Sequence, residues 1–330
     1  MCGIAGIASS GPVDPGLVAR MANSLAHRGP DDQGVWLSDD RRLGLGHRRL
    51  AIVDLSPLGH QPMVSRDSRW VLSFNGEFYN HANLRAELDA ERQRDWRGHS
   101  DTEVFLEAVA SWGVRRALER SVGMFAISLY DRKEHCLYLA RDRFGEKPLY
   151  FGWAGNDLVF GSELKALRQH PGLDNQIERQ ALRLLASRIY VPAPLSIYEG
   201  IYKLEPASIL KLPQESWSKP MTAPPRAGLN PGGASLEHYW SYRNVVAGGL
   251  TDPINDEAEA LERLEHALAT AIRGQSMADV PVGAFLSGGI DSSTVVALYQ
   301  KYSTVPIRTF TIGMDDEHLN EAPHAKRSFA

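Results

Sequence analysis

The chain has 330 residues, of which 43% are hydrophobic and 23% charged, with a formal net charge of −4. This balance is typical of a folded globular protein, excludes a disordered tail, and leaves no basic face for nucleic acid or anionic lipid. Two cysteines cannot form a disulfide framework, and no apolar run approaches the roughly 18 residues that span a bilayer. At roughly 150 residues per domain, we expect two domains in a cytoplasmic protein that binds neither nucleic acid nor membrane.

Strand and turn signals dominate residues 1–212. Asp14–Pro15 is expected to open a helix, Asn80 to cap a second, and Ser100 with Glu103 to form the capping box of a third. Further helices are expected around Leu164 and Leu182. The expected strands are short and closely spaced, which favours antiparallel pairing and a layered α+β domain: residues 4–8, 47–54, 70–75, 124–130, 136–140, 149–153 and 158–160.

The pattern changes after residue 212. Residues 213–233 are rich in proline and glycine, and we interpret 213–254 as a linker or an irregular insertion. From residue 255 a helix with an apolar stripe is expected, made of Leu261, Leu264, Leu268 and Ile272. A buried strand over 280–286, a helix over 293–302 and a strand over 307–312 follow, which is the opening of a doubly wound α/β domain over 255–330.

Cys2 directly follows Met1. Removal of Met1, which the small side chain after it favours, would place a thiol and a free α-amine on one residue. Because the ordinary pKa of such an amine is about 7.7–8.0, it can act as general base for its own thiol. A lone cysteine is more often a small buried residue, so Cys2 alone does not decide the matter.

Seven motifs along the chain together carry a resemblance to a known family. The sequence resembles class II glutamine amidotransferases with the N-terminal nucleophile hydrolase fold, and over nearly its whole length it is similar to glutamine-hydrolysing asparagine synthetases. The motifs are Met1–Gly6, His27–Asp31, His47–Asp54, Phe74–Asn80, His99–Asp101, Arg141–Tyr150 and Gly161–Leu167.

The resemblance implies roles for individual residues. Cys2 would attack the side-chain amide of L-glutamine, while Asn75 and Gly76 stabilise the oxyanion. Arg49 would bind the substrate's α-carboxylate, and Glu77 and Asp101 its ammonium. Leu50, Ala51, Ile52 and Val53 complete the implied glutamine site.

Each of these residues alone has a structural interpretation. Asn75–Gly76 fits a hairpin turn, Asp101 a first-turn acid, and Arg49 a solvated arginine. Only their occurrence as a set favours the site. We interpret His27 and His47 as structural histidines and Cys136 as a core residue.

A glycine-rich loop, Leu286–Ser293, follows the buried strand at 280–286 and opens a helix. Its backbone amides and hydroxyls suit an anion, although no lysine follows as in a P-loop. The loop resembles the pyrophosphate-binding loop of ATP pyrophosphatases, which implies an ATP site and Mg²⁺ held by Asp291. The implied ATP-binding residues are Leu286, Ser287, Gly288, Gly289, Asp291, Ser292, Ser293 and Ile312.

The linked interpretation is an enzyme that makes ammonia from glutamine and uses it, with ATP, to convert L-aspartate to asparagine. Two alternatives stay open: an amidotransferase for another carboxylate, and a truncated chain with glutaminase activity only or no catalysis. Because only the start of the α/β domain is present, we expect the 330-residue chain to have at most glutaminase activity. The family resemblance also allows a homodimer.

Overall fold

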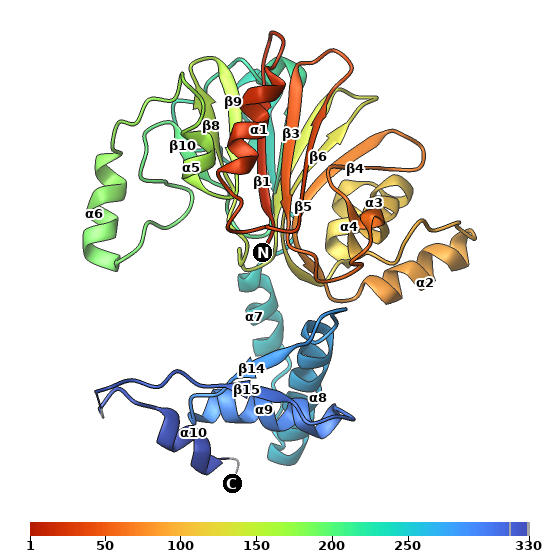
Figure 1. The fold of residues 1–330 in the computed structure, drawn as a ribbon, viewed down its shortest axis with the longest axis vertical. Helices are drawn as coiled ribbons and strands as arrows, with labels where there is room; N and C mark the ends of the chain where they lie inside the picture. Colours follow the sequence, from red (N-terminus) through yellow and green to blue (C-terminus); the bar gives the residue numbers. More distant parts are fainter. Residues whose placement is uncertain (317, 329–330) are drawn as a thin grey trace. The chain divides into compact units, whose positions relative to one another are not determined.

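The computed structural model describes residues 1–316 and 318–328 and divides into two compact units, Met1–Asn244 and Val245–Ala330 (Figure 1). The first unit is built on two large sheets. The second contains one small parallel sheet with helices.

Six antiparallel strands form the first sheet, in the order β10-β8-β9-β1-β3-β2. β1 lies inside this sheet, paired with β3 on one side and β9 on the other. Cys2, the residue before β1, therefore lies at the end of an interior strand. The strands are β1 (Gly3–Ala8), β2 (Asp32–Leu37), β3 (Leu43–Arg49), β8 (Tyr150–Ala154), β9 (Asp157–Gly161) and β10 (Ile201–Lys203).

Seven antiparallel strands form the second sheet, in the order β12-β13-β11-β7-β6-β5-β4. Its longest strands, β5 and β6, pair along nine residues from Trp70↔Asp131 to Phe78↔Gly123. The strands are β4 (Met63–Val64), β5 (Trp70–Phe78), β6 (Gly123–Asp131), β7 (Cys136–Arg141), β11 (Ser208–Pro213), β12 (Gly228–Leu229) and β13 (Ser235–His238).

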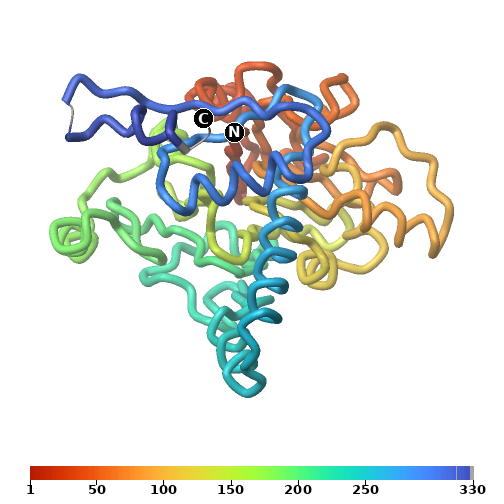
Figure 2. The backbone as a smooth tube through the Cα atoms, turned by 90° about the horizontal axis from the view of Figure 1, so that it is seen from below, coloured from red at the N-terminus to blue at the C-terminus, as the bar shows by residue number. Residues whose placement is uncertain are grey.

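The two sheets pack face to face and helices cover their outer faces, which confirms the expected layered α+β architecture. Ile4 of β1 and Val71 of β5 share the core between the sheets. α1 (Pro15–Asn23) and α5 (Leu164–Leu167) pack on the first sheet. α2 (His81–Glu91), α3 (Asp101–Trp112) and α4 (Val114–Arg120) pack on the second. α6 (Arg179–Arg188) stands away from both sheets in both views (Figure 1 and Figure 2).

Two expected helix caps behave differently from each other. Ser100 Oγ accepts a hydrogen bond from Glu103 N at 3.2 Å and begins α3 as expected, but the Glu103 carboxylate binds the amides of Arg97 and Gly98 instead of closing the capping box. Asn80 makes no side-chain capping bond to α2. Instead, Asn80 Nδ2 donates to Arg120 O, and Asn80 Oδ1 accepts from Val122 N. These bonds connect the start of α2 to the end of α4 and to the residue before β6.

The strand expected over residues 47–54 ends at Arg49, so the expectation is wrong for residues 50–54. The reason lies in its neighbours. The pairing with β2 ends at Asp32↔Arg49 and the pairing with β1 at Gly3↔Arg48, so no ladder partner remains beyond these residues. Residues 50–56 form a loop followed by a short 3-10 turn, Pro57–Gly59.

Residues 213–254 contribute strands to the second sheet. β13 pairs with β11 through Ser208↔His238, and β12 pairs with β13. The proline-rich stretch is therefore an irregular insertion in the first unit, which continues to Asn244.

The second unit has the expected order of helix, strand, loop, helix and strand. The strand expected to be buried over 280–286 is, however, only Gly283–Phe285, and Phe285 is 77% exposed. α7 (Tyr242–Thr251) spans the division, and α8 (Glu257–Gln275) begins at Asp256, whose carboxylate accepts from Glu259 N at 2.8 Å. β14 (Gly283–Phe285) and β15 (Arg308–Phe310) pair in parallel, with α9 (Ile290–Tyr302) between them in sequence and α10 (Ala322–Ser328) after them. The expected apolar stripe of α8 is half exposed, at Leu261 and Leu264.

Candidate active site

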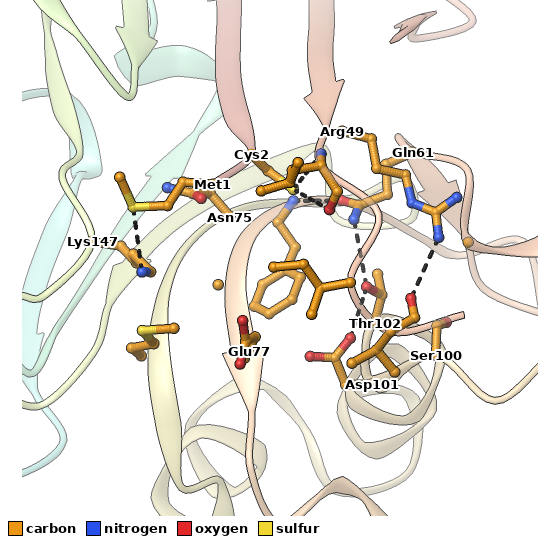
Figure 3. Close-up of a pocket in the computed structure, with 17 residues that line it drawn as sticks. Met1, Cys2, Arg49, Gln61, Asn75, Glu77, Ser100, Asp101, Thr102 and Lys147 are labelled. Atoms are coloured by element: carbon orange, nitrogen blue, oxygen red, sulfur yellow. Dashed lines mark hydrogen bonds between the residues drawn. The ribbon is translucent and has the colours of Figure 1, made fainter. Parts of the chain in front are cut away.

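A cavity of about 60 Å³ in the first unit brings together the two residues before β1, residues of β3, β5, β6 and α3, and residues of several loops (Figure 3). Of the residues implied for glutamine hydrolysis and binding, only Ala51 does not line it. The Ala51 amide instead binds Asp31 at 2.9 Å. The implied residues that line the cavity are Cys2, Arg49, Leu50, Ile52, Val53, Asn75, Gly76, Glu77 and Asp101.

The thiol of Cys2 lies against the loop that follows β3. Its Sγ is 3.4 Å from Leu50 N and 3.7 Å from Leu50 O. Burial raises the pKa of the Cys2 thiol, so near neutral pH it is protonated and needs a base before it can attack. Burial also lowers the pKa of the chain-terminal amine, which in this structure belongs to Met1.

Asn75 and Gly76 lie inside β5, which excludes the hairpin-turn interpretation. The Asn75 side chain is fully buried, and neither Nδ2 nor Oδ1 has a hydrogen-bond partner among residues 1–316 and 318–328. A side chain at Gly76 has no room, because its Cβ would lie 2.1 Å from Met124 O on the adjacent β6. The site therefore presents a buried amide without a partner next to a backbone that another strand approaches closely.

Arg49 is buried, and carbonyl groups of the loop after β3 hold its guanidinium. Nη1 donates to Ser56 O at 3.0 Å, and Nη2 donates to the carbonyls of Val53 and Asp54. Gly59 packs directly on the guanidinium, where any Cβ would collide with Nη2. The solvated-arginine interpretation is thus excluded, and the loop fixes the cation at the cavity wall.

Two carboxylates face the same cavity. Asp101 opens α3, and its Oδ2 accepts from Phe78 N at 2.9 Å. Burial raises the pKa of Asp101, and burial followed by the negative charge of Asp101 raises the pKa of Glu77. A bound ammonium would relieve both effects, because a nearby opposite charge favours the ionised carboxylate.

Sequence reasoning missed eight residues of the cavity wall. Gln61 joins two elements of the site, since Oε1 accepts from Phe74 N at 2.7 Å and Nε2 donates to Thr102 Oγ1 at 3.4 Å. No sequence signal marks Gln61, whereas Lys147 lies inside a recognised motif. The eight are Met1, Gly59, Gln61, Phe74, Ser100, Thr102, Met124 and Lys147.

His47, His27 and Cys136 lie outside the cavity wall. His47 is fully buried, its Nε2 lies 2.9 Å from Phe74 O, and burial lowers its pKa to about 4. His27 lies half-exposed, 3.0 Å from Glu163. Cys136 is buried on β7.

In the second unit, the glycine-rich loop forms a hydroxyl-lined turn before α9. Ser287 Oγ lies 2.9 Å from Ser292 Oγ, and Gly289 N donates to Ser287 Oγ at 3.4 Å. Gly288 has φ +84°, a conformation that favours glycine, and a Cβ there would lie 2.8 Å from Ala325 N. Ser293 Oγ is buried and has no hydrogen-bond partner in the part of the chain that the structure describes.

The other residues implied for ATP differ in their surroundings. Leu286 is buried, while Ile312 is 67% exposed and Asp291 lies exposed in the first turn of α9. Within residues 1–316 and 318–328, no group of three His, Cys, Asp or Glu side chains could hold a metal ion by itself.

The helices in the described part of the chain include none long and apolar enough to cross a membrane.

Residues 1–221 match the glutamine amidotransferase domain family, and residues 263–330 match asparagine synthase.

Two curated relatives match along most of the chain. Glutamine-hydrolysing asparagine synthetase 1 of Bacillus subtilis is 31% identical over 335 residues, covering 100% of this chain and 48% of its own length. Synthetase 3 of the same organism is 33% identical over 308 residues, covering 90% of this chain and 45% of its own length. The chain thus spans about half the length of these relatives.

The fold also matches a solved structure. Glutamine phosphoribosylpyrophosphate amidotransferase of Bacillus subtilis superposes with a TM-score of 0.51 at 19% identity, covering 72% of this chain and 49% of that one. This likeness supports the N-terminal nucleophile hydrolase fold of the first unit. With its family match over residues 1–221 and the asparagine synthase match that follows, the chain belongs to the glutamine amidotransferase domain family.

Proposed function

We propose that the first unit hydrolyses L-glutamine, with Cys2 as nucleophile. One observation carries the proposal: the buried Asn75 amide, with no partner of its own, lies in the same cavity as the Cys2 thiol. An unpartnered buried amide costs free energy in the resting protein. A ligand oxygen that develops negative charge would supply the missing acceptor.

The reaction requires Cys2 to be the first residue, so we propose that Met1 is removed. The free amine takes the thiol proton, and sulfur attacks the side-chain carbonyl carbon of glutamine. Asn75 Nδ2 and the Gly76 amide donate to the resulting oxyanion, a contribution of about 3 kcal/mol per donor. The terminal ammonium of Cys2 returns its proton to the leaving nitrogen, and the C–N bond breaks. Ammonia departs, and the glutamyl group remains bound to Cys2 as a thioester. Water then hydrolyses the thioester to glutamate and restores the thiol.

Substrate binding follows from the charges around the cavity. Arg49 suits the α-carboxylate, because its guanidinium has five donors and only some are used by the loop carbonyls. Glu77 and Asp101 suit the α-ammonium. The apolar side chains of Ile52 and Val53 would contact the aliphatic part of the substrate.

For the whole protein, we propose ATP-dependent synthesis of asparagine from aspartate with the ammonia so released. ATP supplies the chemistry that activates the acceptor carboxylate. The Ser287 and Ser292 hydroxyls, which lie 2.9 Å apart at the start of α9, would hold a phosphate, and Asp291 would hold Mg²⁺ with the phosphate oxygens. We also propose a cytoplasmic location, which two unpaired cysteines suit, and assembly as a homodimer, which rests on the family resemblance.

Ammonia release from glutamine tests the first proposal. Wild type is expected to release ammonia and glutamate in equal amounts, and Cys2→Ala to release none. Cys136→Ala is the matched control, because it removes the other free thiol from β7, outside the cavity, and is expected to keep the activity. Equal release by wild type and Cys2→Ala would remove Cys2 from its role.

Intact mass of the purified protein tests the maturation step. Active protein is expected to lack the mass of one methionine. Glutaminase activity in protein that retains Met1 would contradict the amine's role as base.

A further inference from the structure

Lys147 carries a buried positive charge that has no counterion in direct contact. The residue is 6% exposed and lines the cavity. Across the described residues, no carboxylate oxygen lies within 4.0 Å of Nζ, whose one hydrogen-bond partner is the Met1 thioether sulfur at 3.5 Å. Burying an ammonium without a counterion costs free energy of folding. The charge of Lys147 therefore does not stabilise the protein, and we look for a role in the site.

The loop that presents Lys147 is held by two buried side chains. Asp142 is fully buried and accepts from the amides of Phe144, Glu146 and Lys147 at 2.9–3.1 Å. Arg141 donates through Nε to Lys147 O at 2.6 Å and through Nη1 to Leu204 O at 2.7 Å. The start of the Lys147 side chain is therefore fixed by its own backbone.

The ammonium points toward the chain terminus (Figure 3). Arg28 approaches the same terminus, with Nη2 at 3.9 Å from the Met1 sulfur and Nε donating to Cys2 O at 2.8 Å. The two cations differ in whether a carboxylate pairs with them. Arg28 is paired with Glu163 at 2.9 Å, whereas Lys147 is not paired. The charged or titratable groups around the terminus are Cys2, Arg28, Glu77 and Lys147, with Arg49 and Asp101 facing the thiol.

We propose that Lys147 is a positioning residue for glutamine hydrolysis: its unpaired ammonium keeps the terminal amine of mature Cys2 neutral and available as the base. This inference rests on the proposed function of Cys2. A cation near an amine disfavours a second positive charge, so it opposes protonation of the amine. In this structure burial is the main cause that lowers the pKa of the terminal amine. Arg28 and Lys147 lower that pKa further, while Cys2 and Glu77 act in the opposite direction.

The direct test is the titration of the terminal amine itself. The pH dependence of the NMR chemical shift of the Cys2 Cα, in protein isotope-labelled at cysteine, gives the midpoint without any need for catalysis. Lys147→Met is expected to raise that midpoint by about one pH unit, and Lys147→Arg to restore it. Lys211→Met, on the exposed position of β11, is expected to leave it unchanged.

The glutaminase pH profile gives a second readout. In Lys147→Met the acid limb of the kcat/KM profile is expected to move to higher pH by as much as the amine midpoint moves. At pH 6.5 this shift lowers kcat/KM roughly tenfold. Lys147→Met is expected to fold, since it removes a buried unpaired charge. Glu77→Gln gives an independent check on the amine, whose midpoint is expected to fall.

Several outcomes would overturn the inference. An unchanged amine midpoint in Lys147→Met would do so, as would a loss of activity that is uniform across pH, which marks a structural role. A higher KM for glutamine with an unshifted profile would instead place Lys147 on the substrate. If wild type releases no ammonia, the proposed function fails and the role in hydrolysis fails with it, while the titration still shows whether Lys147 lowers the pKa of the terminal amine.

Discussion

At the residue scale, two buried polar groups of the candidate site stand out among the described residues: the Asn75 amide has no hydrogen-bond partner, and Lys147 Nζ has only the Met1 sulfur. Sequence motifs pointed to Cys2, Arg49, Asn75 and Asp101, because each belongs to a short recognisable run. They could not show that the Asn75 amide is unpartnered or that Lys147 reaches the terminus. Both facts depend on contacts between residues far apart in the chain.

Replacement of Asn75 is expected to separate activity from stability. Asn75→Ala should lower kcat by roughly 10²–10³-fold, because one oxyanion donor is lost. Its free energy of unfolding should not fall by more than about 1 kcal/mol, since the amide has no partner to lose and only a small cavity forms. Steady-state kinetics and urea unfolding check the two parts. A large loss of stability with full activity would contradict both.

Glu163 is expected to give the first unit a pH-dependent contribution to stability. Its pKa is lowered from 4.5 to about 2 against the cost of burial, by hydrogen bonds from Arg28, His27 and Lys165. Because the folded pKa lies below the unfolded one, the stabilisation is complete above pH 4.5 and is lost as the pH falls toward about 2.

The substitution Glu163→Gln tests this contribution. We expect it to cost about 1–3 kcal/mol of unfolding free energy at pH 7, with the difference from wild type narrowing below pH 4.5. Urea unfolding at several pH values measures it. A difference that stays constant down to pH 3 would show that the Glu163 charge is not responsible.

At the element scale, local patterns predicted β1, β3 and β5 to β9 in their order, but they missed β2, β4 and β10 to β13 and several boundaries. β3 ends at Arg49 because its partners end there, and the apolar residues that follow it gave no such signal. β12 and β13 escaped prediction because a run rich in proline and glycine is typical of a linker. In both cases long-range pairing decided the local structure.

The close contact of β5 with β6 predicts a strong effect at Gly76. Gly76→Ala would place a Cβ 2.1 Å from Met124 O, so the two strands must separate. We expect a loss of about 2–4 kcal/mol in unfolding stability together with loss of glutaminase activity. Gly11→Ala is the control, because nothing lies within 4 Å of its Cβ position. Equal stability of the two variants in urea would contradict the expected contact.

At the scale of the whole molecule, the two units differ in how much they bury. The first has three extensive cores between and outside its sheets, whereas the described core of the second comprises Leu286, Val296 and Ala325, with Ala284 and Ile307 packed against it. The sequence predicted two domains and an apolar stripe on α8. Leu261 and Leu264 are in fact exposed.

This difference predicts two separate stabilities within one chain. In hydrogen exchange, amides of residues 245–328 are expected to exchange faster than those of β1, β5 and β6, by about 100-fold or more, because little buried surface protects them. Moderate urea should unfold the second unit while ammonia release continues. A single transition in which both units exchange and unfold together would contradict the prediction.

Asn75 and Gly76 lie in the middle of a strand that is paired to its neighbour along its full length. A donor on a flexible loop can drift from its target while the rest of the protein stays intact, but these donors move only if the sheet itself shears. We therefore expect heating to leave the glutaminase site active until the two sheets of the first unit unfold. Loss of activity and unfolding should then occur at the same temperature.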